Sequence, residues 1–232
     1  MAKLNKRLAQ AYQLVDKNKF YQLDEALNIL CQTSKIKFDE TVDLAVRLGL
    51  DPRKAEENIR GTVALPHGTG KKVRVLAFCK IEKQNEAKAA GADYVGAEDL
   101  IEKIQNGWFE FESVIATPDM MAQVGKIGKI LGPRGLMPNP KVGTVTQDIG
   151  KTIEAIKSGR IEYRIEKAGI VHVGAGKISF GQQKLKENLV TLIETLVKAK
   201  PKTSKGIYLK TISLSSTMGP GLKIDVAPFR NA

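Results

Sequence analysis

The segment TVDLAVRL at Thr41–Leu48 carries an apolar residue at every second position, beginning with Val42. This period of two is typical of a β-strand that buries one face in a protein core. It is the one clear strand in the first third of the sequence, where the periods at 4–15 and 23–30 instead predict helices. Because one strand cannot make a stable sheet, its partners must come from elsewhere in the chain.

The missing partners are expected in the last third of the sequence. Alternation at 161–165 and an apolar run at 170–173, joined by the turn Lys167-Ala168-Gly169, predict a hairpin. A long amphipathic helix follows at 185–197. Strands are expected at 207–214 and 222–226, and a change of apolar phase predicts a β-bulge near Lys210–Thr211.

Between these two parts lies a segment of a different kind. The buried run Val73–Phe78 opens an alternation of short strands and helices, which is typical of a small parallel α/β unit. We therefore expect residues 1–67 and 160–232 to form one α+β domain, a sheet packed with helices, split by an insertion at 68–159. Linkers near 66–72 and 158–160 would join the two domains as a hinge.

Charge is the first indication of function. The formal net charge is +12, and residues 159–232 carry +8 of it, which favours a polyanion partner such as nucleic acid over a plain solubilising surface. No apolar run approaches the roughly 20 residues that span a bilayer, and no apolar signal core follows the charged N-terminus. We expect a cytoplasmic protein without a membrane partner.

Known catalytic and cofactor patterns are missing from the sequence. Phe78–Glu82, after the first strand of the insertion, has no GxGxxG glycines, and neither Gly70-Lys71 nor Gly176-Lys177 completes a P-loop. No GxSxG motif occurs, and the two cysteines and two histidines show no metal-ligand spacing. We expect no enzyme, catalytic residue, metal or cofactor. An RNA-modifying enzyme and a protein-binding scaffold stay open as alternatives.

Three segments contain more special residues than folding requires. The first is GKIGKILGPRGLMPNPKV at Gly125–Val142, and the second is SLSSTMGPGL at Ser213–Leu222, where hydroxyls and amides can donate to phosphate and ribose. The third is KIKFDET at Lys35–Thr41. Lys37 and Thr41 share the outward phase of the first strand, whereas Phe38 shares the phase of its apolar residues and is predicted to face the core.

These segments carry a resemblance that covers essentially the whole chain. GPRGLMPNPKVGTV at Gly132–Val145, the stretch from Lys37 to Lys71 and SSTMGPG at Ser215–Gly221 resemble the bacterial large-subunit ribosomal protein family of the lateral stalk, protein L-one. The resemblance implies a split α+β domain with a Rossmann-like insertion. It also implies a monomer within the cytoplasmic ribosome, bound to the stalk junction of large-subunit (23S) rRNA.

The resemblance further implies two regulatory or accessory roles and a set of contact residues. Members of the family assist release of exit-site tRNA and can repress translation of their own operon mRNA. The implied RNA-binding residues are Lys37, Phe38, Thr41, Lys167, Ser213, Ser215, Thr217, Met218 and Gly219. The mechanism we expect is recognition of RNA shape, with lysines adding salt-dependent affinity.

Overall fold

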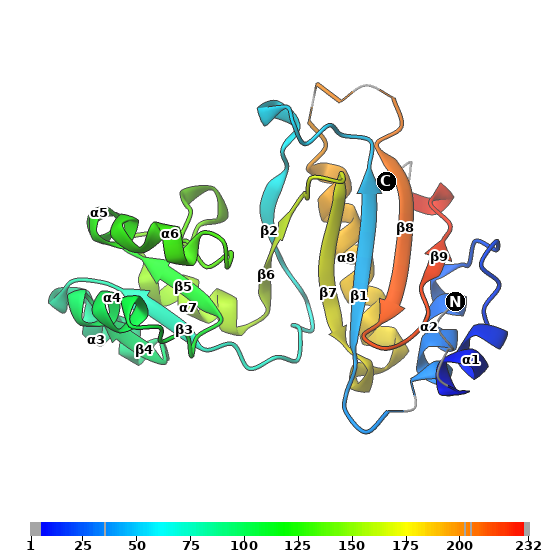
Figure 1. Ribbon diagram of the computed structural model, residues 1–232, viewed down its shortest axis with the longest axis horizontal. Helices are drawn as coiled ribbons and strands as arrows, with labels where there is room; N and C mark the ends of the chain where they lie inside the picture. Colours follow the sequence, from blue (N-terminus) through cyan, green and yellow to red (C-terminus); the bar gives the residue numbers. More distant parts are fainter. Residues whose placement is uncertain (1–5, 35, 202, 205, 230–232) are drawn as a thin grey trace. The chain divides into compact units, whose positions relative to one another are not determined.

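A computed structural model describes residues 6–34, 36–201, 203–204 and 206–229 (Figure 1). The chain divides into two compact units, Met1–Gly70 with Glu162–Ala232 (unit 1) and Lys71–Ile161 (unit 2). Helices and strands alternate in a mixed α/β fold, which confirms the expected class at this level. Leu4 of the first expected helix and Lys35 of the third special segment lie outside the described residues.

Unit 1 contains an antiparallel sheet of four strands in the order β7-β1-β8-β9. The strands are β1 (Thr41–Leu48), β7 (Ile170–Lys177), β8 (Leu209–Ser216) and β9 (Leu222–Ile224). The predicted strand at 41–48 is therefore confirmed, and its partners do come from the last third of the chain.

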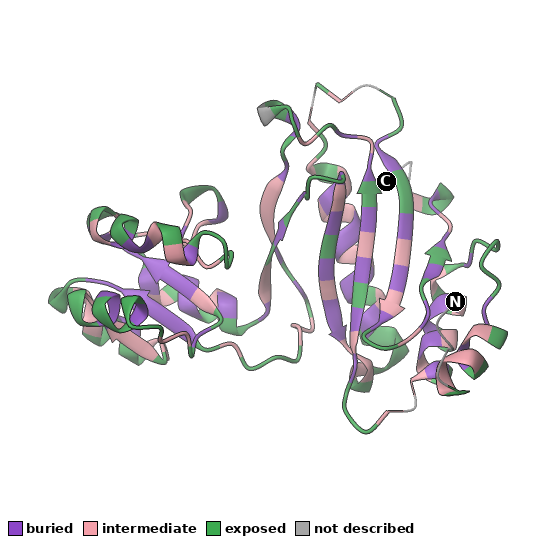
Figure 2. Ribbon diagram, in the orientation of Figure 1, coloured by how far each residue is buried: buried purple, intermediate pink, exposed green. Residues whose placement is uncertain are grey.

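Helices cover one face of this sheet. The helices of unit 1 are α1 (Lys6–Gln13), α2 (Leu23–Thr33) and α8 (Gly181–Lys198), and α2 and α8 pack on each other and on β7, β8 and β9. In Figure 1 the strands lie in front of α8. Along β1, Val42 and every second residue after it are buried, while the residues between them are partly or fully exposed (Figure 2). We call the side opposite α2 and α8 the open face.

The predicted β-bulge is confirmed. Arg47 pairs with Thr211 and Leu48 with Leu209, so Lys210 is the extra residue that reconciles the two apolar phases of β8. The strand begins at Leu209, however, and Ile207, which was expected to belong to it, is 61% exposed.

The predicted hairpin at 161–173 is confirmed only at its turn, where an antiparallel bridge joins Ile165 to Val171 and the amide of Glu166 donates to the Ile170 carbonyl at 2.9 Å. β6 (Arg160–Arg164) forms a two-stranded sheet with β2 (Arg60–Ala64), a segment that was not expected to form a strand and that precedes the linker expected near 66–72. Beyond this turn, β7 pairs with β1 and not with β6. Gly61 makes the other pairing possible, because a Cβ there would lie 2.6 Å from the Tyr163 hydroxyl oxygen.

Unit 2 is built around a parallel sheet in the order β4-β3-β5, with helices against both faces. Its strands are β3 (Val75–Phe78), β4 (Tyr94–Gly96) and β5 (Ser113–Ala116); its helices are α3 (Ile81–Ala89), α4 (Glu98–Gln105), α5 (Met121–Val124), α6 (Gly128–Leu131) and α7 (Ile149–Lys157). Two core clusters flank the sheet, which explains why all of β3 is buried.

Short 3-10 helices complete the described structure, at Ala55–Glu57, Pro118–Met120, Gly125–Ile127, Pro140–Val142, Ile178–Phe180 and Ala227–Phe229. Within the described ranges, no helix combines the length and apolar character needed to cross a membrane.

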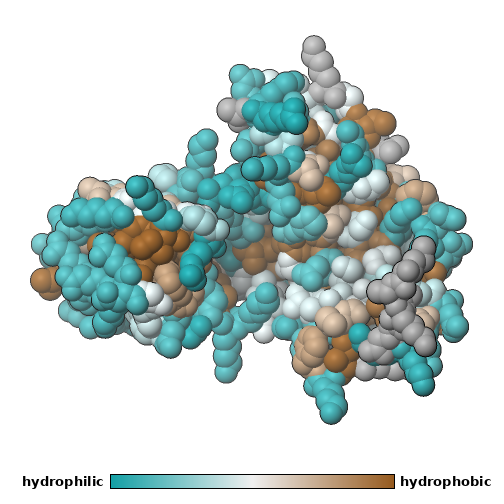
Figure 3. Space-filling view, in the orientation of Figure 1, coloured by the Kyte–Doolittle hydropathy of each residue, from teal (hydrophilic) through white to brown (hydrophobic). Residues whose placement is uncertain are grey.

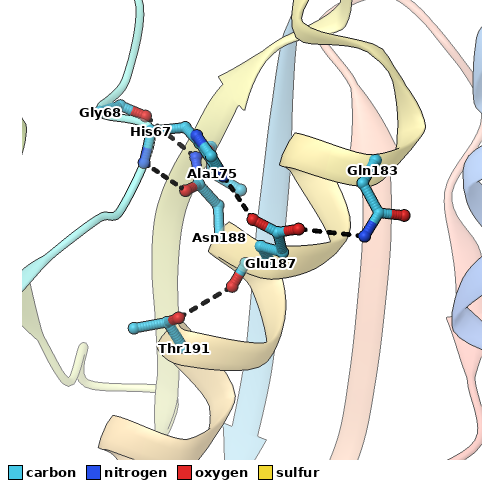
Figure 4. A network of polar contacts seen from close by, with 7 residues as sticks. All are labelled: His67, Gly68, Ala175, Gln183, Glu187, Asn188 and Thr191. Carbon is cyan, nitrogen blue, oxygen red and sulfur yellow. Dashed lines mark hydrogen bonds and ion pairs between the residues drawn. The ribbon is translucent and has the colours of Figure 1, made fainter.

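The end of unit 1 that leads into residue 71 is tied to α8 by a buried amide (Figure 4). Asn188 is fully buried; its side chain donates to the carbonyls of Gly68 (3.0 Å) and Ala175 (2.8 Å) and accepts from the amide of His67 (3.1 Å). Beside it, hydrogen bonds from His67 and Gln183 hold the pKa of Glu187 below its usual range. The chain therefore leaves unit 1 from a fixed point.

Candidate nucleic-acid interface

The first residue of β1 and the loop after β8 meet at one end of the sheet. The amide of Thr41 donates to the Thr217 hydroxyl at 3.0 Å, and the amide of Thr217 donates to the Thr41 carbonyl at 3.1 Å. These residues are 176 positions apart, so two of the predicted segments form one surface. The Thr217 hydroxyl is engaged within the protein, and its part in the interface is to fix the loop.

A buried carboxylate holds the loop from beneath. Glu40 is 1% exposed, and its Oε1 accepts from the amide of Met218 (2.8 Å) and the hydroxyl of Ser216 (3.3 Å). The hydroxyl of Ser34 donates to its other oxygen. A buried carboxylate is tolerated where it has hydrogen-bond donors, and here those donors come from the end of α2 and from the loop. Glu40 therefore fixes the backbone of residues 216–218.

Gly219 is needed for this arrangement. Its amide closes a turn onto the Ser216 carbonyl at 3.1 Å, and a Cβ on Gly219 would lie 2.2 Å from the Ser216 hydroxyl oxygen. Any side chain would push that hydroxyl away from Glu40. Gly221, two residues on, has no atom within 4 Å of such a Cβ, so the requirement is specific to Gly219.

Two large apolar side chains are exposed at this end of the sheet, one in the loop and one in the segment that leads into β1. Met218 is 53% exposed, and its carbonyl accepts from Arg7 of α1 at 3.1 Å. Phe38 is 51% exposed, so the prediction that it faces the core is wrong. The strand begins only at Thr41 and the chain bends around residues 36–38, so the inward phase of β1 does not extend back to Phe38.

Lysines stand at the same end of the sheet. Lys37 is exposed in the segment that leads into β1. Lys177, at the end of β7, donates to the Asp39 carbonyl and to the Thr41 hydroxyl, both at 3.0 Å. Sequence motifs did not single out Lys177 or Glu40 as part of the interface. The sequence does indicate that Glu40 is buried, because it lies two residues before Val42 and therefore shares the inward phase of β1.

Ser213 and Ser215 lie on the open face. They pair in register with Ala45 and Asp43 of β1, and both are partly exposed, whereas Ser216 turns inward. On the other side of β1, a Cβ on Gly174 would lie 3.3 Å from a methyl carbon of Thr41. Because glycine has no side chain, no atoms project from the open face at this position. Figure 3 shows pale side chains of intermediate hydropathy among teal ones on this side of unit 1.

Lys167 is separated from the other predicted residues. It lies in the turn before β7, where the Gly169 carbonyl accepts from the amide of Leu48 at 2.9 Å. That is the opposite end of β1 from Thr41, roughly 23 Å away along an extended strand. The structure thus gathers Lys37, Phe38, Thr41 and Thr217–Gly219 at one end, continues to Ser213 and Ser215, and leaves Lys167 apart.

The glycine- and proline-rich loop after α6 belongs to unit 2 and is held by short-range bonds. The Asn139 side chain accepts from the Lys141 amide at 2.8 Å, and its backbone amide donates to the Thr144 hydroxyl at 2.8 Å. Leu136 and Met137 pack against the core cluster, and the Arg134 guanidinium carbon lies 3.6 Å from the centre of the Phe109 ring. Much of this loop's composition therefore serves its own folding.

A comparison with known protein families identifies the family of this chain. A sequence model described as the ribosomal protein L1p/L10e family matches residues 30–220, well over half of the chain. The chain therefore belongs to this family, and the resemblance seen in the sequence is confirmed. Membership makes it a protein of the large ribosomal subunit that binds ribosomal RNA.

Proposed function

We propose that this member of the ribosomal protein L1p/L10e family binds the stalk junction of 23S rRNA through the Thr41 end of its four-stranded sheet. The observation that carries the proposal is the loop at Ser216–Gly219, held rigid by buried Glu40 and paired with Thr41. A surface fixed before binding loses little conformational entropy when RNA covers it.

The mechanism follows from what the loop presents. A-form RNA hides base edges in its deep groove, so a protein recognises backbone shape, ribose hydroxyls and irregular junctions. The fixed loop offers the exposed side chain of Met218, and the exposed ring of Phe38, in the segment that leads into β1, offers a second apolar contact. Lys37 and Lys177 add attraction to phosphates that does not depend on sequence. Loop shape, rather than any single lysine, should decide affinity for the junction.

The finer features of the family are also proposals for this chain. We propose that residues 68–159 are an inserted Rossmann-like domain; the parallel sheet with helices on both faces supports this. Release of exit-site tRNA, repression of the protein's own operon mRNA, and action as a cytoplasmic monomer without enzymatic activity rest on the resemblance. Filter binding to deacylated tRNA and translation of the operon mRNA with added protein test the first two.

The principal test compares two RNAs across a salt series. One is a stalk-junction fragment of 23S rRNA, and the other is a plain duplex of equal length. We expect tight binding to the junction that persists at physiological salt, with the duplex bound far more weakly. Equal affinities for the two RNAs that fall together as salt rises would mean that the basic surface binds polyanions without recognising the junction. Junction binding that ignores salt would favour a protein-binding scaffold over an RNA site.

A pair of variants separates loop shape from charge. Thr217→Val removes the hydroxyl that accepts from the Thr41 amide, whereas Lys37→Ala removes an exposed charge. We expect Thr217→Val to weaken junction binding more, and Lys37→Ala to weaken both RNAs alike while reducing the salt slope by about one. Lys177→Ala is a poorer comparison because Lys177 also donates to Thr41. A larger junction-specific loss from Lys37→Ala would contradict the mechanism.

A further inference from the structure

The open face of unit 1 does not end at β9. Tyr21 adds an edge beside that strand: its amide donates to the Lys223 carbonyl at 2.8 Å, and its carbonyl accepts from the Asp225 amide at 2.9 Å. A parallel bridge pairs Tyr21 with Ile224. The segment before α2 is thus part of the same sheet, on the side away from β7.

Alternation then decides which side chains reach the open face. Tyr21 is 3% exposed and Ile224 is 1% exposed, so both point towards the helices. Their neighbours Phe20 and Lys223 must point the other way. Phe20 is 60% exposed, and the Lys223 Nζ lies 6.0 Å from the centre of its ring, which agrees with that placement. An exposed aromatic ring is therefore fixed at the sheet edge by its buried neighbour.

The strand register joins this edge to the interface. Lys223 pairs with Ser213, Ser213 with Ala45, and Ala45 with His172. These residues form a row across the open face, about 14 Å long at the usual strand spacing. The row runs from β7 to β9 and ends at Phe20, and it includes Ser213, one of the residues expected to contact RNA.

The chemistry of the row fits a nucleotide. A ring stacks on a base, a lysine pairs with phosphate, and a serine hydroxyl bonds to ribose or phosphate. Carboxylates also lie on or beside this face: Asp43 pairs in register with Ser215, Asp225 accepts from the Ala227 amide at 3.0 Å, and the Glu166 carboxylate lies 3.8 Å from His172 Nε2 at the β7 end of the row. Lys19, next to Phe20, is paired with Glu25, so Lys223 is the cation placed to meet a phosphate beside the ring.

We propose that the RNA bound at the Thr41 end crosses the open face along this row, and that one unpaired base stacks on Phe20 while its phosphate meets Lys223. The inference rests on the proposed function and extends it by a second contact at the opposite edge of the sheet. It also names what is recognised there: an unpaired nucleotide.

The test measures binding of the full chain to the stalk-junction fragment. The variants are Phe20→Ala, Phe20→Tyr and Lys223→Gln. Matched controls are Ile207→Ala, which removes another exposed apolar side chain from unit 1, and Lys198→Gln, whose lysine side chain is 80% exposed. Thermal unfolding of each variant verifies that the fold is kept. The same fragment with single abasic sites in its unpaired nucleotides serves as a second probe.

Phe20→Ala should weaken binding by about 5- to 100-fold, and Phe20→Tyr should restore it, because either ring stacks on a base. Lys223→Gln should lower the salt slope by about 0.7 to 0.9. One abasic site should abolish the difference in affinity between the unsubstituted protein and the Phe20→Ala variant. If Phe20→Ala matches Ile207→Ala while Thr217→Val still weakens binding, the stacking site is wrong and the proposed function stands. If Thr217→Val also leaves binding unchanged, the stacking site and the proposed function are both wrong.

Discussion

Two glycine- and proline-rich loops drew attention in the sequence, and the structure holds them in different ways. The loop at 216–221 is fixed by distant residues, because Glu40 and Thr41 bind it from more than 170 positions away. The loop at 132–143 is fixed mainly by its own neighbours, such as Asn139 and Thr144. The first presents exposed Met218 above a buried carboxylate, whereas the second packs Met137 against a core.

The difference shows what composition can and cannot indicate. Glycine and proline mark both loops as turns with unusual backbone requirements. Only the long-range contacts show that one loop is a rigid part of a sheet edge, suited to recognising the shape of a ligand. If this distinction is correct, changes beneath the first loop should affect RNA binding, and changes within the second should affect only the stability of unit 2.

Glu40→Leu should have the largest effect. The change leaves the Met218 amide and the hydroxyls of Ser34 and Ser216 without their acceptor. We expect the free energy of unfolding to fall by about 2–3 kcal/mol, since buried unsatisfied donors are costly. Junction affinity should fall with it. Urea unfolding and filter binding measure the two effects. Unchanged junction affinity in a folded Glu40→Leu protein would contradict the claim that Glu40 holds an RNA-binding loop.

Gly219→Ala should follow, with Gly221→Ala as its matched control. The new methyl at 219 would displace the Ser216 hydroxyl, whereas the methyl at 221 enters open space. We expect Gly219→Ala to cost about 1–2 kcal/mol of stability. Junction affinity should fall about tenfold, a change of roughly 1.4 kcal/mol. Gly221→Ala should leave both quantities unchanged. Equal effects at the two positions would mean that the close approach at Gly219 is unimportant.

Asn139→Ala tests the second loop. The side chain caps a short turn by accepting from the Lys141 amide, and such caps contribute about 1 kcal/mol. Hydrogen exchange should show faster opening in unit 2, and filter binding should show unchanged affinity for the junction RNA. A loss of junction affinity as large as that of Gly219→Ala would give the two loops the same role.

Arg134→Ala should have the smallest effect. It removes a guanidinium that lies over the Phe109 ring, a contact that contributes about 0.5–1 kcal/mol at an exposed site. We expect a small decrease in the melting temperature and no change in junction affinity. A marked loss of affinity for the junction would place this loop in the interface.

Much of the fold followed from period and phase. The strand at Thr41–Leu48, the stripe of α8 and the buried run of β3 were visible because burial repeats regularly along each element. The bulge at Lys210 was predictable for the same reason, since two apolar phases in one strand require an extra residue.

Pairing and short-range breaks in phase were harder to predict. The turn at 167–169 predicted a hairpin, but β6 pairs with β2. The residues of β2 do not alternate clearly between apolar and polar, and the closeness of Gly61 to Tyr163 is visible only in the folded chain. Phe38 lies beyond the bend that ends the phase of β1. Among site residues, Thr217–Gly219 followed from the family resemblance. The supporting role of Glu40 depends on contacts between residues far apart in sequence.

Hydroxyl-radical oxidation of methionines tests the central claim most directly, because each loop carries one. Met218 lies in the first loop and is 53% exposed; Met137 lies in the second and is partly buried. Oxidation of each would be measured with and without the stalk-junction RNA. We expect strong protection of Met218 and an unchanged rate at Met137. An unchanged rate at Met218, with the RNA bound, would contradict the assignment of the Glu40-held loop as the RNA-binding surface.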